Sequence, residues 1–294
     1  MRRLIMIHGR SQQAHDPVAL KADWVAALHR GLAAAGIDFE IPDERIRLAY
    51  YGDTLDVLAE GLHGPVPEVV IKGVGDPDEG EKAFIAGAVK DAVEAMGIEP
   101  AEILAAAAPD APVEKGVQNW PWVLAALRAL DVVPGVGSAA LFCVTHDVYR
   151  YLRNPGIQFA VESGVGKAFA SDEECVVVAH SLGTVIAYNL LRKEAEERRW
   201  KVSSLITVGS PLAVGPIVEG LSPIAWPAGV ATWFNAFDRR DVVALHPLDS
   251  PHFPVTPAIE NYSHVQNTTG NRHGISGYLG DPVVARRIHD ALLA

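Results

Sequence analysis

The chain has 294 residues, of which 49% are hydrophobic and 21% charged, and this composition predicts a globular protein rather than a disordered one. The formal net charge of -11 argues against a nucleic-acid partner, because proteins that bind DNA or RNA gain most of their affinity from Lys and Arg on phosphates. Only Cys143 and Cys175 are present, which is too few for a disulfide framework.

The beginning of the chain predicts a strand, a helix and a second strand. The short apolar run at residues 4–7 is typical of a strand buried on both faces. A helix is expected to begin after Asp16, whose side chain can cap it, and to end before Gly36. Apolar side chains alternate within residues 45–53, which predicts the second strand. This order favours a parallel sheet.

A long helical block follows, from about residue 54 to about residue 172. Its Ala-rich stretches lie between Pro and Gly breaks, and no strand in it is convincing. Residues 119–130 predict an amphipathic helix, and residues 146–170 predict two helices that meet at Asn154-Pro155. We interpret the block as an insertion between strands, either a cap or a set of ordinary crossover helices.

Strand patterns return at residues 175–180, 203–210 and 231–238, with a helix expected at 182–198. The segment from 239 to 279 is rich in His, Pro, Asn and Gly and is expected to be loop-like, and a final helix at 282–293 begins after Asp281. The sequence therefore predicts one α/β domain over residues 1–294, with a mostly parallel central sheet flanked by helices and a helical insertion at 54–172.

The chain shows no pattern of membrane insertion. The apolar run after the two N-terminal arginines is too short for the core of a signal peptide. No run approaches the roughly 18 apolar residues that a membrane-spanning helix needs. We therefore expect no transmembrane segment and a cytoplasmic location.

The segment AHSLG, residues 179–183, places a serine between a predicted strand and a predicted helix. A sharp turn there projects Ser181 from the end of the sheet and directs the first free N–H groups of the helix to the same point. Such a turn requires small neighbours, and Ala179 and Gly183 meet that requirement. A nucleophilic serine needs this presentation together with a base. The alternative is a serine that only caps the helix.

This segment resembles the nucleophile elbow G-x-S-x-G of the α/β-hydrolase superfamily, with Ala179 in place of the first glycine. The resemblance implies the α/β-hydrolase fold and an acid and a histidine that follow the serine in that order. Asp238 and Asp241 both follow the strand at 231–238. The superfamily often writes this turn as an aspartate followed by valine, which favours Asp241 and leaves Asp238 as a turn residue.

Four histidines lie between the acid and the final helix, and the resemblance favours His273 as the base. It lies in a Gly-rich loop shortly before the final helix, where the superfamily carries its catalytic histidine. His264 is the main alternative, and His246 and His252 are interpreted as loop histidines beside prolines.

Two backbone N–H groups are expected to form an oxyanion hole. One belongs to Leu182, directly after the serine. The other is assigned to Arg10, because His8-Gly9-Arg10 resembles the H-G-x loop of the superfamily.

These residues predict a serine hydrolase, esterase- or lipase-like, that cleaves carboxylic esters through an acyl-enzyme. The Ala, Leu and Trp content of the helical block favours an apolar substrate, a small-molecule or lipid ester. A thioesterase or amidase with the same residues, or a binding module without activity, remains an alternative. No cofactor is expected, and the C-terminal histidines lack the tight spacing of a metal site.

Overall fold

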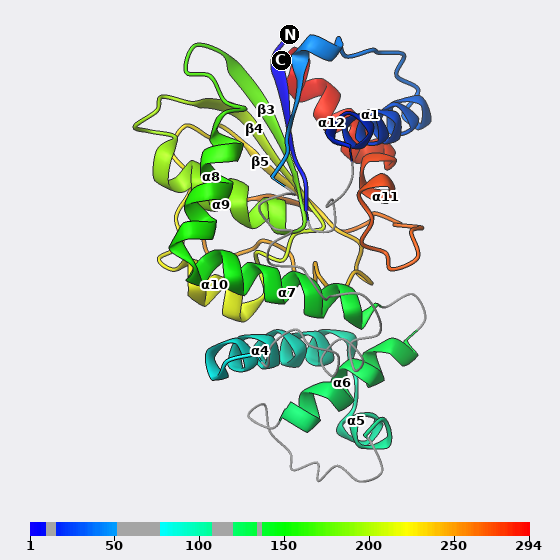
Figure 1. Cartoon of the computed structure of the whole chain (residues 1–294). Helices are drawn as coiled ribbons and strands as arrows, with labels where there is room; N and C mark the ends of the chain where they lie inside the picture. Colours follow the sequence, from blue (N-terminus) through cyan, green and yellow to red (C-terminus); the bar gives the residue numbers. More distant parts are fainter. Residues whose placement is uncertain (10–15, 52–76, 108–119, 134–136) are drawn as a thin grey trace.

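The computed structural model describes residues 1–9, 16–51, 77–107, 120–133 and 137–294. At its centre is a sheet of six parallel strands in the order β2-β1-β3-β4-β5-β6. Figure 1 shows both termini at the end of the sheet where the strands begin. The strands are β1 (Arg3–Ile7), β2 (Ile46–Ala49), β3 (Glu174–His180), β4 (Lys201–Val208), β5 (Trp233–Ala236) and β6 (Glu260–Tyr262).

The sheet confirms the prediction of an α/β fold with a parallel sheet, and its first five strands lie within or beside the predicted segments. The segment 239–279, expected to be loop-like, also contains β6 and the helix α11 (Ile275–Leu279). β6 has three residues, is only partly buried and carries no apolar run, so hydrophobic patterning does not detect it. It is recognisable only through its pairing with β5.

Helices cover both faces of the sheet. On one face lie α1 (Pro17–Ala34), α11 and α12 (Pro282–Leu293), and on the other lie α8 (Pro155–Gly166) and α9 (Leu182–Glu194). The apolar run in β1 packs on both faces of the sheet. Leu4 and Met6 pack toward α1, whereas Ile5 and Ile7 pack toward α9. Its side chains therefore join two separate hydrophobic layers.

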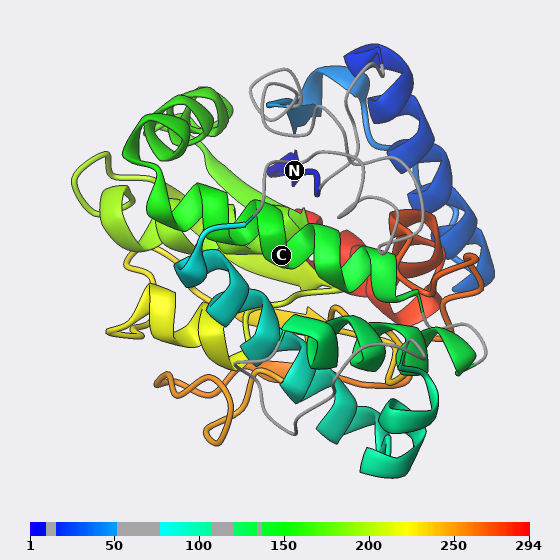
Figure 2. The ribbon, with the colours of Figure 1, turned by 60° about the horizontal axis from the view of Figure 1, so that its bottom comes forward.

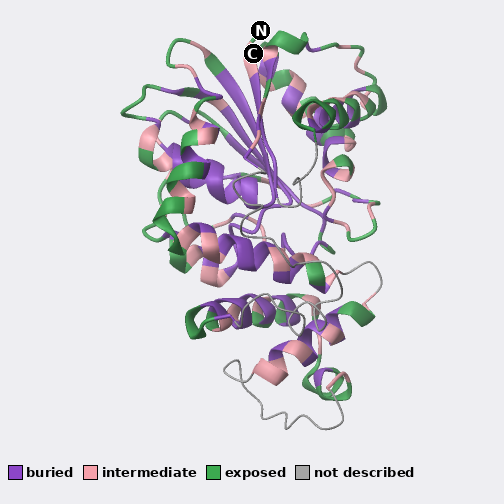
Figure 3. Ribbon diagram, in the orientation of Figure 1, coloured by how far each residue is buried: buried purple, intermediate pink, exposed green. Residues whose placement is uncertain are grey.

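The remaining helices form a layer beyond the carboxyl ends of the strands (Figure 1). It comprises α4 (Glu79–Met96), α5 (Pro100–Ala105), α6 (Trp120–Val132) and α7 (Ser138–Arg153), which share their own apolar cluster, and α10 (Gly215–Leu221) packs against α4 and α7. Figure 2 shows α7 crossing in front of the strands when this layer is turned forward. In Figure 3, buried residues follow the strands and continue on α4 and α7.

The predicted helical block therefore divides into two parts. Within the described residues between 77 and 172 it contains helices and no strand. The helices α4, α5 and α6 pack with α7 as a cap, while α8 packs beside α9 like a crossover helix.

The predicted helix boundaries follow from side-chain caps. Asp16 accepts a hydrogen bond from the N–H of Val18 and begins α1, and Asp281 does the same for α12. The side chain of Asn154 caps α8 directly after α7 ends, which confirms the predicted break. The Pro- and Gly-rich segment 211–229 contains α10. A short 3₁₀ helix, η1 (Asp43–Arg45), precedes β2.

In the described part of the chain, no helix combines the length and the apolar character that crossing a bilayer requires.

The start of α9 lies unusually close to β1. A Cβ added at Gly183 would lie 2.5 Å from the carbonyl oxygen of Ile7 and closer still to that of His8. Both of these neighbours are backbone atoms of a buried strand and its loop, so they have little freedom to move. The absence of a side chain at Gly183 is what allows the turn after β3 to pack against the end of β1.

We therefore expect Gly183→Ala to destabilise the protein by about 1–3 kcal/mol, as overpacking of a rigid interior does. Gly164, in α8, is a matched control because a Cβ there would meet nothing within 4 Å. Gly164→Ala should be neutral or raise stability by up to about 1 kcal/mol, since alanine favours the helix. Urea unfolding of both variants measures the difference, and equal free energies of unfolding would contradict the close-approach argument.

Candidate active site

Ser181 occupies the turn between β3 and α9 in a strained conformation. Its φ of 55° and ψ of -131° are values that side-chain-bearing residues rarely adopt, at a cost of about 1–3 kcal/mol. The side chain makes no capping hydrogen bond with α9, so the alternative of a simple helix cap is wrong. Instead, the hydroxyl of Thr184 donates to the carbonyl of Ser181. The strain thus presents the Ser181 hydroxyl at the carboxyl end of the sheet.

His273 lies against Ser181 and Asp241 at once. Its Nε2 is 2.8 Å from Ser181 Oγ, and its Nδ1 is 2.8 Å from Asp241 Oδ2. An ionised carboxylate can only accept, so the proton sits on Nδ1 and Nε2 accepts from the serine hydroxyl. The structure thus brings the three predicted side chains, which come from three separate turns, into one hydrogen-bonded chain.

Asp241 is fully buried in the turn after β5, and its carboxylate is surrounded by donors. Oδ1 accepts from the N–H of Val243 at 2.9 Å. Oδ2 accepts from His273 and also from the hydroxyl of Tyr278 at 2.5 Å. Three donors offset the loss of hydration that burying a carboxylate entails.

Asp238, the alternative acid, has a different position. Its Oδ1 accepts from the N–H of Arg240 and its Oδ2 from the N–H of Asn267, each at 2.9 Å. This is the turn role that the sequence predicted for it. Asp238 also anchors the chain that leads to His273, because the side chain of Asn267 donates to the carbonyl of Gly274.

The other candidate histidines lie elsewhere. His264 is exposed and packs against the edge of Tyr262. His246 and His252 stack on each other with ring centroids 4.4 Å apart, and His252 is bound to Asp249. None of these three imidazoles forms a hydrogen bond with Ser181 in the structure.

The backbone around His273 is held on both sides. The side chain of Asn271 accepts from the His273 N–H at 3.1 Å, and the ring of His180 donates through Nε2 to the His273 carbonyl at 2.8 Å. Burial, and then the proximity of His273, lowers the pKa of His180 well below its usual value, so this ring stays neutral. Sequence reasoning missed the contacts of His180 and Tyr278 with this site. In the sequence, the only indication that His180 contacts the site was its position directly before Ser181.

The loop after β1 passes directly beside Ser181. A Cβ at Gly9 would lie 2.7 Å from the Cβ of Ser181. His8, which is fully buried, accepts from the N–H of Tyr51 through Nε2, so its Nδ1 donates to the carbonyl of Gly9 at 2.6 Å. The Tyr51 hydroxyl donates to the His8 carbonyl, and the two rings stack. These bonds fix the loop up to Gly9.

Of the two predicted oxyanion donors, Leu182 lies within the described residues. Leu182 is the first residue of α9, where a helix has no earlier carbonyl to satisfy its N–H. Arg10 lies outside the described residues.

A cavity of about 410 Å³ opens onto Ser181 and His273. One wall is apolar and comes from α7, and the opposite wall comes from the segment around His273. The lining residues are Ala139, Ala140, Cys143, Val144, His180, Ser181, Asn271, His273, Gly274, Ile275 and Ser276. None of these side chains carries a fixed charge, so among the described residues the cavity favours a neutral ligand.

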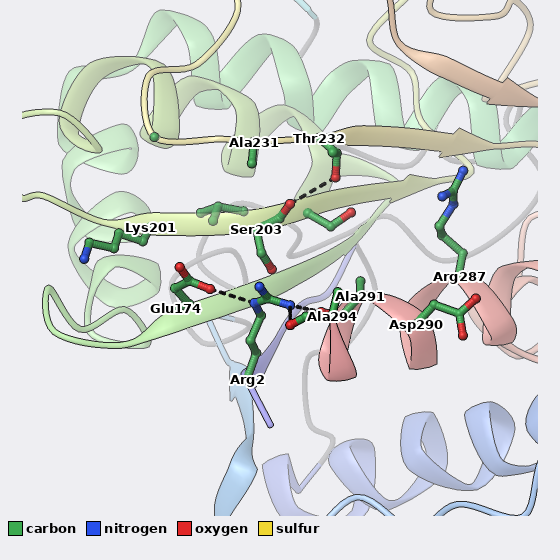
Figure 4. A pocket seen from close by; sticks show the side chains of 13 residues that line it. Arg2, Glu174, Lys201, Ser203, Ala231, Thr232, Arg287, Asp290, Ala291 and Ala294 are labelled. Atoms are coloured by element: carbon green, nitrogen blue, oxygen red, sulfur yellow. Dashed lines mark hydrogen bonds and ion pairs between the residues drawn. The ribbon is translucent and has the colours of Figure 1, made fainter.

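A second cavity, of about 420 Å³, lies at the other end of the sheet, where the strands begin (Figure 4). Two of its hydroxyls are occupied, since Ser203 donates to the Cys175 carbonyl and Thr232 donates to the Ser203 carbonyl. Arg2 is paired with Glu174. No histidine of the described residues lines this cavity, so they do not provide there the base that a nucleophilic serine needs.

Among the residues that the structure describes, no three His, Cys, Asp or Glu side chains are grouped so that they could hold a metal ion. Models of protein families, curated proteins and solved structures were compared with the chain, and none matches it.

Acid should destabilise the protein through His8. Burial lowers its pKa from 6.5 to about 4, against the opposing effect of the hydrogen bond to Gly9. Between these values the unfolded chain binds a proton that the folded chain excludes. The stabilisation is therefore complete above pH 6.5 and is lost as the pH falls toward about 4, on the order of 3 kcal/mol in total.

Urea unfolding from about pH 7 to about pH 4 measures this effect. His8→Gln should show a shallower loss of stability with falling pH than the wild-type protein. His264→Gln is the control, because that side chain is already exposed in the folded protein. Parallel pH profiles for the wild type and His8→Gln would refute the assignment.

Proposed function

We propose that this protein is a serine hydrolase of the α/β-hydrolase type that cleaves carboxylic esters through an acyl-enzyme. The observation that carries the proposal is the hydrogen-bonded chain in which His273 Nε2 lies 2.8 Å from Ser181 Oγ and Nδ1 lies 2.8 Å from Asp241. A nucleophile, a base and an orienting acid within hydrogen-bond reach are what such chemistry requires. The same distances argue against a binding module that has lost its activity.

The order of the elements supports the α/β-hydrolase type. Ser181 follows β3, Asp241 follows β5 and His273 follows β6, all at the carboxyl edge of the parallel sheet. In α/β proteins this edge is where ligands bind. The strained φ at Ser181 and the close approach of Gly183 to β1 agree with a nucleophile elbow.

In the proposed reaction, Ser181 Oγ attacks the ester carbonyl carbon while its proton passes to Nε2 of His273. The carbon–oxygen bond to the alcohol then breaks, and the departing alcohol oxygen takes the proton from Nε2. The acyl group remains on Ser181. Water next gives a proton to Nε2 and attacks the acyl carbon, and Ser181 Oγ leaves with that proton as the carboxylic acid departs. Throughout, Asp241 balances the charge of the imidazolium.

The proposed oxyanion donors are the N–H groups of Leu182 and Arg10. Support for Leu182 is its place at the start of α9, directly after the nucleophile. Support for Arg10 comes from the position of the preceding Gly9 beside Ser181. The apolar wall that α7 contributes to the cavity favours a neutral ester with an apolar acyl or alcohol group, including lipid esters.

A fluorophosphonate probe should label this protein, and Ser181→Ala should abolish the labelling. The probe phosphonylates a serine only when a base activates the hydroxyl, so labelling reports the proposed chemistry. Ser203→Ala is the control, since that serine lines the cavity at the other end of the sheet and donates to a backbone carbonyl. Failure to label the folded wild-type protein, or persistent labelling of Ser181→Ala, would remove the proposal.

The two aspartates should differ in kinetics. Asp241→Asn is expected to lower kcat for an activated ester by roughly 10³–10⁴-fold, because an amide no longer enforces the tautomer in which Nε2 accepts. Asp238→Asn should change kcat less than about tenfold and should mainly lower the free energy of unfolding, since within the described residues the Asp238 carboxylate bonds to backbone N–H groups and Arg272. Steady-state assays of both variants decide this, and equal losses of kcat would contradict the assignment of Asp241.

A further inference from the structure

Tyr278, in α11, shares an acceptor atom with His273. Its hydroxyl lies 2.5 Å from Asp241 Oδ2, the same oxygen that accepts the His273 Nδ1 proton at 2.8 Å. The other carboxylate oxygen is held by the N–H of Val243. The proposed mechanism uses Asp241 and His273 but assigns no part to this phenol.

The phenol is a donor to the carboxylate at every working pH. Burial, and then the charge of Asp241 and the hydrogen bond to it, raise the pKa of Tyr278 well above its usual value. The N–H of Asp238 donates weakly to the same phenol oxygen, at 3.4 Å, which leaves the hydroxyl proton directed at Asp241. A neutral phenol and an ionised carboxylate form a short, charge-assisted hydrogen bond.

The ring of Tyr278 is positioned independently of its hydroxyl. It is fully buried, and a Cβ at Gly209 would lie 2.8 Å from its Cε2. Gly209 has a φ of 55° at the end of β4, so the lack of a side chain there both permits the turn and leaves room for the ring. The same added Cβ would lie 3.2 Å from the ring of His180. Packing therefore holds the aromatic ring in place even without the oxygen.

Two donors on one oxygen compete. The Tyr278 hydroxyl attracts part of the negative charge of Asp241 Oδ2. That part is less available to the Nδ1 proton that Asp241 shares with His273. We propose that Tyr278 is a positioning residue that tempers the attraction of Asp241 for the His273 proton and so sets the pH range in which Ser181 is activated. This inference rests on the proposed function, because it assigns a part to Tyr278 in the same reaction.

Tyr278→Phe tests the proposal because it removes the donor and keeps the ring. In this variant the N–H of Val243 should still hold Asp241 in place. The carboxylate of Asp241 should then attract the Nδ1 proton of His273 more strongly. The acidic limb of the profile of kcat/KM against pH should then move up by about half to one pH unit. In proton NMR, the resonance of the His273 Nδ1 proton should move further downfield. An unchanged acidic limb together with an unchanged resonance would overturn the proposal.

Two further proteins separate this effect from a general loss of packing. Tyr188→Phe deletes another buried phenol oxygen, one that bonds to the backbone of Ala225, and should leave the pH profile and the resonance unchanged. Site-specific 3-fluorotyrosine at position 278 keeps the hydroxyl, makes it a stronger donor and should move the acidic limb to lower pH. Shifts of the acidic limb in the same direction for Tyr278→Phe and for the fluorotyrosine protein would refute the proposal. The same outcome refutes it if Tyr278→Phe is poorly folded.

The NMR measurement also separates the two proposals. If the wild-type protein neither hydrolyses esters nor reacts with a fluorophosphonate, the proposed function fails. The response of the His273 Nδ1 proton to Tyr278→Phe and to fluorotyrosine is still measurable in that case, and its absence alone refutes the role of Tyr278.

Discussion

The strained turn at Ser181 is the constraint on which the rest of the site depends. A side-chain-bearing residue with a φ of 55° persists only where the surrounding structure enforces it. Here β3 fixes one side of the turn by pairing with β1 and β4, and α9 fixes the other by packing against the sheet. Gly183 allows these two elements to meet at the end of β1. The hydroxyl of Ser181 is thereby held at the carboxyl edge of the sheet.

A buried polar network surrounds that hydroxyl, and its members satisfy one another. Asp241 receives three hydrogen bonds, and the backbone of His273 is bound through Asn271 and His180. Since an unpaired buried polar group destabilises the fold, the pairing that holds these side chains also restricts them to one geometry. Two neutral histidines, His8 and His180, support the site without adding charge.

The helical layer gives the site its cavity. Because α7 lies across the carboxyl ends of the strands, its small apolar residues face Ser181 across a space of about 410 Å³. The packing of α4, α5 and α6 with α7 then determines the position of α7, which lines the cavity. The sheet thus positions the reactive groups, whereas the cap shapes the space in which a ligand would lie.

By itself, the sequence predicted the parallel α/β core and the turn at Ser181, because buried strands, helix caps and a strand-to-helix turn leave local patterns. The choice of Asp241 and His273 came from the resemblance to a known superfamily. It did not reveal β6, the helix α11 or the contacts of Tyr278 and His180 with the site. A three-residue edge strand has too few residues for a periodic pattern, and β6 exists because β5 lies beside it. Tyr278 reaches Asp241 across 37 residues, and such a contact arises only when Gly209 makes room for the ring in the folded chain. Only the tertiary structure could decide these pairings, since they depend on distances between segments that no local pattern encodes.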